Sequence, residues 1–446
     1  MKSRLPIYIS AVLLVSLVLC GCAHYRPYPL PTAPDLAKTP QLTVPVRQFW
    51  LPGLAPHPVP ANGLDETTVV MLAVFNNPDL KAARLRAGVA GAQVFAAGLL
   101  PDPQFAAGAY MAAVNYGGDL GLSEEIRSWI TRGAARAAAA AAQKQVNLDI
   151  LWQEEQVAAQ AQQLFVQIRA GSRLRAVYAA TDRLLAAQYR RDHTAMERGD
   201  ATSTAVSSEL VALSDAETAL RQLESQADLA RRQLNALLGL DADVQLHLIG
   251  PAAIAPLTPT AFHAAIASLP RRRADLLALQ AGYQSQEENV RLAVLRQFPA
   301  LSLGAGFDRE LEVEPINGFG PAATLSLPIF NRNRGQIAVQ RATRAVLRQT
   351  YQARLDAAVS QAGEVWGAAR IEAAQLRDLN ARLPLLRQTA AAAERSLERS
   401  HLNATAYVSL ESGYLAKEAQ AIQLEAALES EQSALRLLLG LPFAAH

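Results

Sequence analysis

The sequence contains almost no cysteine. Its 446 residues include only Cys20 and Cys22, both in the apolar N-terminal segment. Disulfide bonds and cysteine metal sites in the body of the protein are therefore excluded. The seven histidines are scattered, with no pair at metal-ligand spacing, so we expect neither a metal nor any other cofactor.

The chain also lacks an excess of charge of either sign. Charged residues make up 18% of the sequence and the formal net charge is +2, which gives no electrostatic argument for a nucleic-acid partner. Beyond the N-terminus there is no apolar run of the roughly 18 residues that a transmembrane helix needs. If the mature chain crosses a bilayer, it must do so as strands that close into a barrel.

Proline is missing from most of the chain. None occurs between Pro103 and Pro251, and only Pro384 and Pro442 occur after residue 329. Such stretches, rich in Ala, Leu, Gln, Glu and Arg, predict very long helices. Between Leu213 and Leu237 the apolar residues recur in steps of three, four and seven, which is typical of a coiled-coil seam.

The prolines are concentrated near the N-terminus, where residues 22–60 read as an extended leader. Before it, Lys2 and Arg4 precede a short apolar stretch, and Leu19-Cys20-Gly21-Cys22 resembles a bacterial lipobox. We therefore interpret residues 1–21 as a lipoprotein signal peptide and Cys22 as the lipidation site. An ordinary signal peptide with an incidental cysteine is the alternative.

The body of the chain consists of two similar sequence repeats. Asp79 and Asp275 are 196 residues apart, and so are Pro103 and Pro299. Each copy is expected to run helix, β-hairpin, very long helix. We divide the chain into a first repeat at 61–240, an equatorial linker at 241–258 and a second repeat at 259–446.

Short alternating segments predict the strands. From Leu301 to Asp308 apolar residues alternate with small or polar ones, and the first copy repeats this pattern more weakly. We expect membrane strands within 103–125 and 299–328. The membrane-strand residues that we single out are Leu301, Leu303, Phe307, Leu325 and Leu327. Four strands cannot close a barrel alone, so they must close with copies from other chains or lie outside a membrane.

With its duplicated Asn-Pro-Asp-Leu-type helix start, the Leu-Pro-Asp-Pro strand entry at Leu100–Pro103 and the run Leu325–Phe330, the chain resembles the TolC family of outer-membrane efflux channels. The resemblance implies a mainly α homotrimer with a twelve-stranded barrel, four strands per chain, above a periplasmic helical tunnel with an equatorial belt. It also implies a lipid-anchored outer-membrane protein of a Gram-negative bacterium. Its partners would be an inner-membrane efflux transporter and a periplasmic adaptor.

The resemblance further implies that two helical hairpin tips close the periplasmic end. In this sequence the tips fall near Gly199 and near residues 401–408. Ala205 and Tyr407 stand where family members carry aspartate, so the usual gate links are not reproduced. The candidate gate residues are Arg198, Gly199, Asp200, His401, Asn403 and Tyr407.

No catalytic constellation is present, so we do not expect an enzyme. Neighbouring carboxylates such as Glu154 and Glu155 are adjacent on a helix and diverge. We expect the basic run Arg271–Arg273 on an exposed helical turn. The alternative to a channel is a periplasmic coiled-coil lipoprotein that acts as a scaffold or adaptor, and the sequence does not identify a cargo.

Overall fold

The structure is a computed structural model that describes residues 25–41, 58–111, 116–251, 256–311 and 316–442. The described residues belong to two units, one that ends at Leu36 and one that begins at Ala37. In the first unit, residues 25–36 are exposed and form neither helix nor strand. The predicted lipidation site, Cys22, lies outside the described residues.

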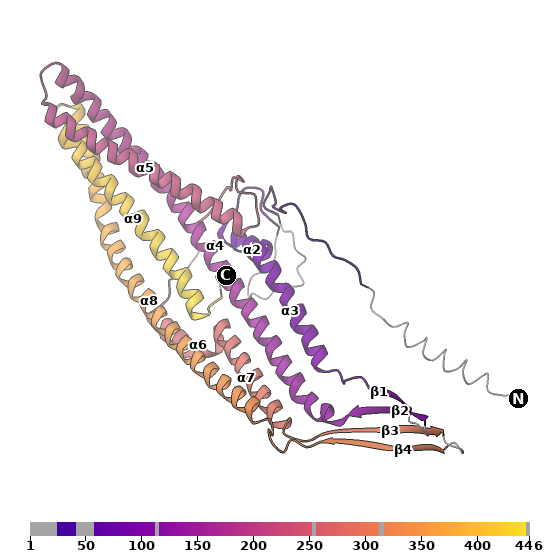
Figure 1. The fold of residues 1–446 in the computed structure, drawn as a ribbon. Helices are drawn as coiled ribbons and strands as arrows, with labels where there is room; N and C mark the ends of the chain where they lie inside the picture. Colours follow the sequence, from indigo (N-terminus) through magenta and orange to yellow (C-terminus); the bar gives the residue numbers. More distant parts are fainter. Residues whose placement is uncertain (1–24, 42–57, 112–115, 252–255, 312–315, 443–446) are drawn as a thin grey trace. The chain divides into compact units, whose positions relative to one another are not determined.

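The second unit contains the same series of elements twice (Figure 1). The first series is α2 (Glu66–Asn76), α3 (Pro78–Ala97), β1 (Gln104–Met111), β2 (Tyr116–Glu125), α4 (Ile126–Glu197) and α5 (Ser203–Leu237). The second series is α6 (Pro259–Arg272), α7 (Ala274–Leu295), β3 (Ala300–Leu311), β4 (Ile316–Ser326), α8 (Arg334–Glu398) and α9 (Ala404–Leu439). The predicted duplication is confirmed. Each repeat has two helices before its hairpin where the sequence predicted one.

Local sequence explains why the helices before each hairpin divide in two. Asn77 ends α2 and caps α3, because its Oδ1 accepts a hydrogen bond from Leu80 N at 3.0 Å and Pro78 occupies the first helical turn. Asp65 and Thr258 cap α2 and α6 in the same way, through Thr68 N at 2.8 Å and Ala261 N at 3.2 Å. In the second repeat Arg273 takes the place of Asn77 and forms no side-chain cap.

The four strands form one antiparallel sheet in the order β1-β2-β3-β4. Figure 1 shows that all of them join helices at the same end of the sheet. The central pair, β2 and β3, comes from different repeats and places Leu120 opposite Phe307. The sheet therefore joins the two repeats through main-chain hydrogen bonds.

The four helices that connect directly to the strands lie side by side in the same order as the strands. Helix α3 packs against α4, α4 against α7 and α7 against α8. With 72 residues, α4 is about 108 Å long at 1.5 Å per residue. Helix α5 returns along α4, α9 returns along α8, and α4 also contacts α9.

Each repeat has its own apolar core, built around its first helix. One apolar cluster surrounds α2, with Val69, Leu72 and Phe75 packed against Phe165 of α4 and Leu234 of α5. Its counterpart in the second repeat contains Phe262 stacked on Trp366, with ring centroids 4.7 Å apart. Among the described helices, none combines the length and apolar character needed to cross a membrane.

One predicted strand residue falls outside the sheet. Leu327 follows Ser326, the last residue of β4. Pro328 has no N–H to donate to a ladder, and Ile329 N donates to Leu327 O at 2.9 Å, so the chain turns here instead of extending the strand. Leu301, Leu303, Phe307 and Leu325 lie in the strands as expected.

Candidate functional site

The sheet has one apolar face and one face of polar and small residues. Register fixes both faces, because residues paired across antiparallel strands point to the same side. The apolar face carries Phe105, Leu120, Leu122, Leu301, Leu303, Ala305, Phe307, Phe319, Ala323 and Leu325, and the charged residues on it, Glu124 and Arg309, lie near the two ends of the strands. The opposite face carries Gln104, Asp119, Ser123, Glu125, Ser302, Asp308, Glu310, Ile316 and Thr324 among glycines and alanines.

A row of two aspartates crosses the polar face. Asp119 of β2 and Asp308 of β3 are direct cross-strand partners, and their outer partners are Gly108 and Gly318. A Cβ atom added at either glycine would collide with the neighbouring carboxylate. The two glycines thus leave room for the carboxylates to lie over the sheet. Like charges placed opposite one another are unfavourable, so this pair does not stabilise the sheet.

Gly304 has a different reason to lack a side chain. A Cβ there would collide with Leu122 O and approach Ser123 Cα to 3.0 Å. An arginine at Gly304 would therefore clash with the main chain of β2. Gly306, two residues further along the same face, meets only Leu120 O, at 3.7 Å, and does have room.

Both outer edges of the sheet are open. Within the described residues β1 pairs only with β2, and β4 pairs only with β3. Each edge strand therefore presents a row of unpaired main-chain donors and acceptors, which favours pairing with a strand of another chain.

The chain reverses where the sequence predicted the two hairpin tips. Between α4 and α5, Gly199 adopts φ +85°, and Asp200 N donates to Ala195 O at 2.8 Å. Thr202 caps α5 through Ala205 N at 3.3 Å. At the second tip Asn403 caps α9, with Ala406 N donating to its Oδ1 at 2.8 Å. Asn403, which the sequence analysis names as a gate candidate, therefore caps a helix in this structure.

The other predicted gate residues lie at the tips without forming links across them. Neither Arg198 nor Asp200 has an ion pair among those formed by the described residues, so Arg198 does not neutralise Asp200 within one chain. His401 contributes a main-chain bond to Ser396 O at 2.8 Å. Tyr407 is half-buried, and burial, Glu411 and Glu394 raise the pKa of its hydroxyl.

A polar cluster that the sequence did not reveal lies beside the first tip. The buried Gln188 of α4 donates to Glu209 Oε1 of α5 at 3.1 Å and also contacts Asp192 and Arg191. Burial and the hydrogen bond to Asp192 raise the pKa of the Glu209 carboxyl. The cluster ties α4 to α5 next to the turn. Because Gln188 and Glu209 belong to different helices, helical periodicity alone could not have found it.

A second cluster joins the two repeats. Arg273, at the start of α7, is 1% exposed and donates from Nε to Asp275 Oδ1 at 2.8 Å. Arg354 of α8 donates to the other oxygen of Asp275 at 2.6 Å. Both guanidinium groups lie over Trp152 of α4, at 4.8 and 5.8 Å from its ring. Our expectation of an exposed Arg271–Arg273 turn is wrong for Arg273, because α4 covers it.

Glu155 is the other α4 residue of this cluster. Burial, and then the charge of Asp275, raise the pKa of its carboxyl to about 8, although Arg273 opposes the shift. Its Oε2 is buried without a hydrogen bond. The surroundings of this carboxyl group, between the two repeats, therefore favour its protonated form.

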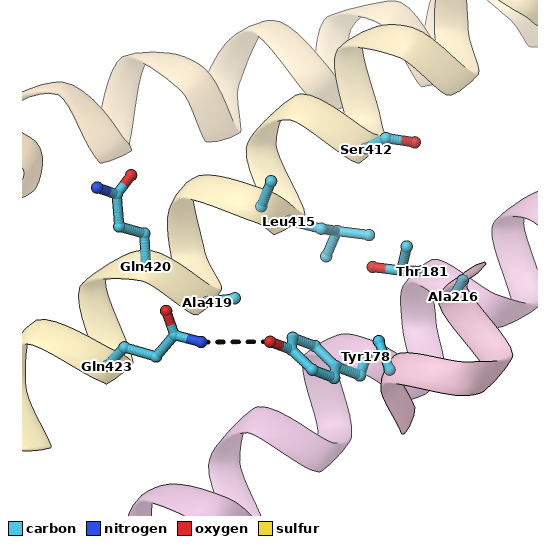
Figure 2. Close-up of a pocket in the computed structure, with 10 residues that line it drawn as sticks. Tyr178, Thr181, Ala216, Ser412, Leu415, Ala419, Gln420 and Gln423 are labelled. Carbon is cyan, nitrogen blue, oxygen red and sulfur yellow. Dashed lines mark hydrogen bonds between the residues drawn. The ribbon is translucent and has the colours of Figure 1, made fainter. Parts of the chain in front are cut away.

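Figure 2 shows a cavity between the helical hairpins, of about 250 Å³. Tyr178 of α4 points towards Gln423 of α9, whose Nε2 donates to the tyrosine hydroxyl at 3.2 Å. The remaining lining is alanine, Leu415 and small polar side chains, with no carboxylate and no basic group. No group of three potential metal ligands exists among the described residues either.

Comparison with solved structures decides the fold. The outer-membrane channel OprN superposes with a TM-score of 0.70 at 16% identity, over 94% of this chain and 99% of that one. The Vibrio cholerae outer membrane protein VceC gives 0.67 at 17% identity, over 85% and 97% of the two chains. The Campylobacter jejuni outer membrane channel CmeC gives 0.67 at 15%, over 94% and 95%. The chain has the TolC-like channel fold.

This fold accounts for the open sheet and the duplicated hairpins together. No protein-family model matches the sequence, nor does any curated protein. The duplicated sequence motifs nevertheless predicted the TolC-like fold. The motifs interpreted as helix starts and strand entries coincide with the beginnings of helices and strands in the structure.

Proposed function

We propose that the protein is the outer-membrane component of a tripartite efflux pump and acts as a passive trimeric exit duct. The observation that carries this proposal is the four-stranded sheet, which is open at β1 and β4 and has one apolar and one polar face. In a bilayer the apolar face would meet lipid and the polar face would line the bore.

Closure requires further copies of the chain. An open edge is not tolerated in hydrocarbon, so β4 of one copy would pair with β1 of the next. Two copies would give eight strands and three would give twelve. An eight-stranded barrel is filled by its own side chains, so a water-filled bore favours three copies.

The helices support the same arrangement. Because α3, α4, α7 and α8 follow the order of the strands, closure would bring α8 of one copy against α3 of the next. Both outer helices carry exposed apolar residues that share a face: Leu85 and Val89 on α3, Val339 and Val346 on α8. These positions are our candidates for the contact between copies.

The duct would perform no chemistry on its cargo. Three copies would place six carboxylates, from Asp119 and Asp308, around the bore, which would favour cations over anions. The hairpin tips at Gly199 and Asn403 would form the periplasmic entrance, next to an adaptor and an inner-membrane transporter. Lipid on Cys22 would anchor the chain at the outer membrane.

The oligomer and the conductance test this function directly. The full-length protein in detergent should have the mass of three chains and form ion-conducting pores in planar bilayers. Val339→Asp combined with Val346→Asp should dissociate the trimer, because it buries carboxylates between copies. The matched Val339→Ala, Val346→Ala variant should remain trimeric. A stable monomer without conductance would refute the duct and favour the coiled-coil scaffold.

A further inference from the structure

The segment between β4 and α8, residues 327–333, presents large apolar side chains to solvent. Phe330 is 93% exposed and Ile329 is 63% exposed. The segment is nevertheless well tied: Arg334 N donates to Asn331 O at 3.0 Å, and Asn333 Nδ2 donates to Ala293 O of α7 at 2.7 Å. A fixed segment that exposes a phenyl ring indicates an apolar partner outside the chain.

Arginines follow the apolar residues directly. Arg332 and Arg334 are exposed, and neither takes part in an ion pair formed by the described residues. Between Glu314 and Asp356 the sequence has six arginines and no acidic residue. Arg332 and Asn333 adopt positive φ angles of 45° and 53°, a conformation that is unfavourable for arginine and tolerated by asparagine. The segment thus presents the exposed ring of Phe330 together with two arginines that form no ion pair within the described residues.

Other apolar side chains are exposed at the same end of the sheet. Trp129 and Ile130 lie in the first turn of α4, and Phe298 lies just before β3 (Figure 1). Trp129 and Phe298 are both 58% exposed. Arg132 and Arg296 stand within three residues of them in the sequence. We call Trp129, Ile130, Phe298, Ile329 and Phe330 the apolar collar.

The duplication indicates that another copy would not cover the collar. Within one chain, β2 and α4 of the first repeat lie beside β3 and α7 of the second repeat. In the proposed assembly, β4 and α8 of one copy would lie beside β1 and α3 of the next copy in the same way. Trp129 and Phe298 stay exposed although the other repeat already lies beside them within the chain. Phe330 should stay exposed in the same way, so its partner is not another copy of the chain.

We propose that the apolar collar, together with Arg332 and Arg334, binds the anionic phospholipid headgroups of the leaflet nearest the helices. The inference rests on the proposed function, because it requires that the sheet crosses a bilayer. Aromatic side chains prefer the headgroup level of a membrane, and a guanidinium group matches phosphate with two parallel hydrogen bonds. The collar then fixes how deeply the sheet sits in the membrane.

The test is lipid binding by the full-length protein in detergent, measured by native mass spectrometry during titration with phosphatidylglycerol or phosphatidylethanolamine. Arg332→Gln combined with Arg334→Gln should weaken phosphatidylglycerol binding at least fivefold and leave phosphatidylethanolamine binding almost unchanged. Replacement of both arginines by lysine keeps the positive charge but not the two parallel hydrogen bonds, so it should restore the binding only in part. The control is Arg341→Gln with Arg348→Gln, two exposed α8 arginines farther from the sheet, which should bind lipid like the wild type.

Three results would overturn the inference. The first is equal phosphatidylglycerol binding by the 332/334 and 341/348 variants. The second is competition by inorganic phosphate, which would indicate a soluble anion. The third is a Phe330→Ser variant that dissociates into monomers yet binds lipid normally, which would make the collar a contact between copies. Failure of the proposed function is recognised separately, because the wild type would then show no conductance in planar bilayers.

Discussion

Arg273 donates a hydrogen bond from Nη1 to the carbonyl oxygen of Leu438, at 3.2 Å. In the first repeat Asn77 makes the equivalent bond to Leu237 O, at 3.4 Å. Both contacts attach the start of the helix that leads into a hairpin to the last turn of that repeat. The duplication therefore extends to individual hydrogen bonds, although the two side chains differ in size and charge.

A glycine follows the last helix of each repeat, close to these contacts, and its role can be tested by substitution. Gly239 and Gly440 follow the last helix of each repeat at φ +66° and +61°. A Cβ on Gly440 would lie 3.0 Å from the N and Cα atoms of Arg273. Gly440→Ala should lower the free energy of unfolding by about 1–2 kcal/mol from backbone strain, with a further loss from the contact. Thermal and denaturant unfolding measure this loss.

The control for Gly440 is Gly413→Ala on the same helix. Nothing lies within 4 Å of a Cβ at Gly413, so alanine there should stabilise the helix by up to about 1 kcal/mol. Equal effects of the two substitutions would show that the contact with Arg273 tolerates a side chain at Gly440.

The sequence predicted the repeats, the strands and the tips because each depends on local chemistry. Periodicity, proline placement and turn residues act over a few positions, and Gly199 and Asn403 carry their signals in their own identity. In the contact between the repeats, Arg273 packs on Trp152, which lies 121 positions earlier in the sequence, so no local pattern reveals this contact. Leu327 was misjudged because the alternation continues past the point where Pro328 ends the ladder.

Glu155 predicts a pH dependence of stability. Its pKa is raised from 4.5 to about 8 in the folded chain, so folding favours the protonated form. The stability is fully present below pH 4.5 and is lost as the pH rises through about 8. Glu155→Gln removes this titration, and the variant should lose less stability than the wild type between pH 5 and pH 8. Melting temperatures across this range provide the measurement.

A matched control for Glu155 is Glu364→Gln, which alters an exposed carboxylate of α8. This variant should follow the pH profile of the wild type. If Glu155→Gln did so too, the carboxyl group would not be the titrating element of the contact between the repeats.

The two faces of the sheet predict opposite responses to charge. Ala305 and Gly306 are neighbours on β3, at nearly the same depth but on opposite faces. Ala305→Arg should destabilise the folded protein in lipid by about 2–4 kcal/mol if the site lies near the bilayer midplane. Gly306→Arg should cost much less, since its side has space. Unfolding in lipid vesicles compares them, and similar losses at both positions would argue against a membrane barrel.

The aspartate row predicts ion selectivity. Asp119→Asn combined with Asp308→Asn removes both carboxylates of the row without changing side-chain size. Reversal potentials in planar bilayers under a salt gradient should show reduced cation preference, while the trimer stays intact. Asp35→Asn, an exposed change in the N-terminal segment, should keep the wild-type value. An unchanged reversal potential for the double variant would place the row outside the bore.

The hairpin tips need variants that separate capping from gating. Asn403→Ala removes the cap of α9 and should lower the free energy of unfolding by about 1 kcal/mol, whatever the residue does in a pore. Asn403→Asp keeps a capping oxygen and adds a negative charge near the helix N-terminus, where the helix dipole favours it. In a three-fold assembly it would add a ring of three carboxylates to the entrance. We therefore expect Asn403→Asp to have the stability of the wild type and a higher cation selectivity. Asp200→Asn should lower the cation selectivity. Single-channel recordings with neither change, on proteins that remain trimeric, would mean that the entrance is not formed by these tips.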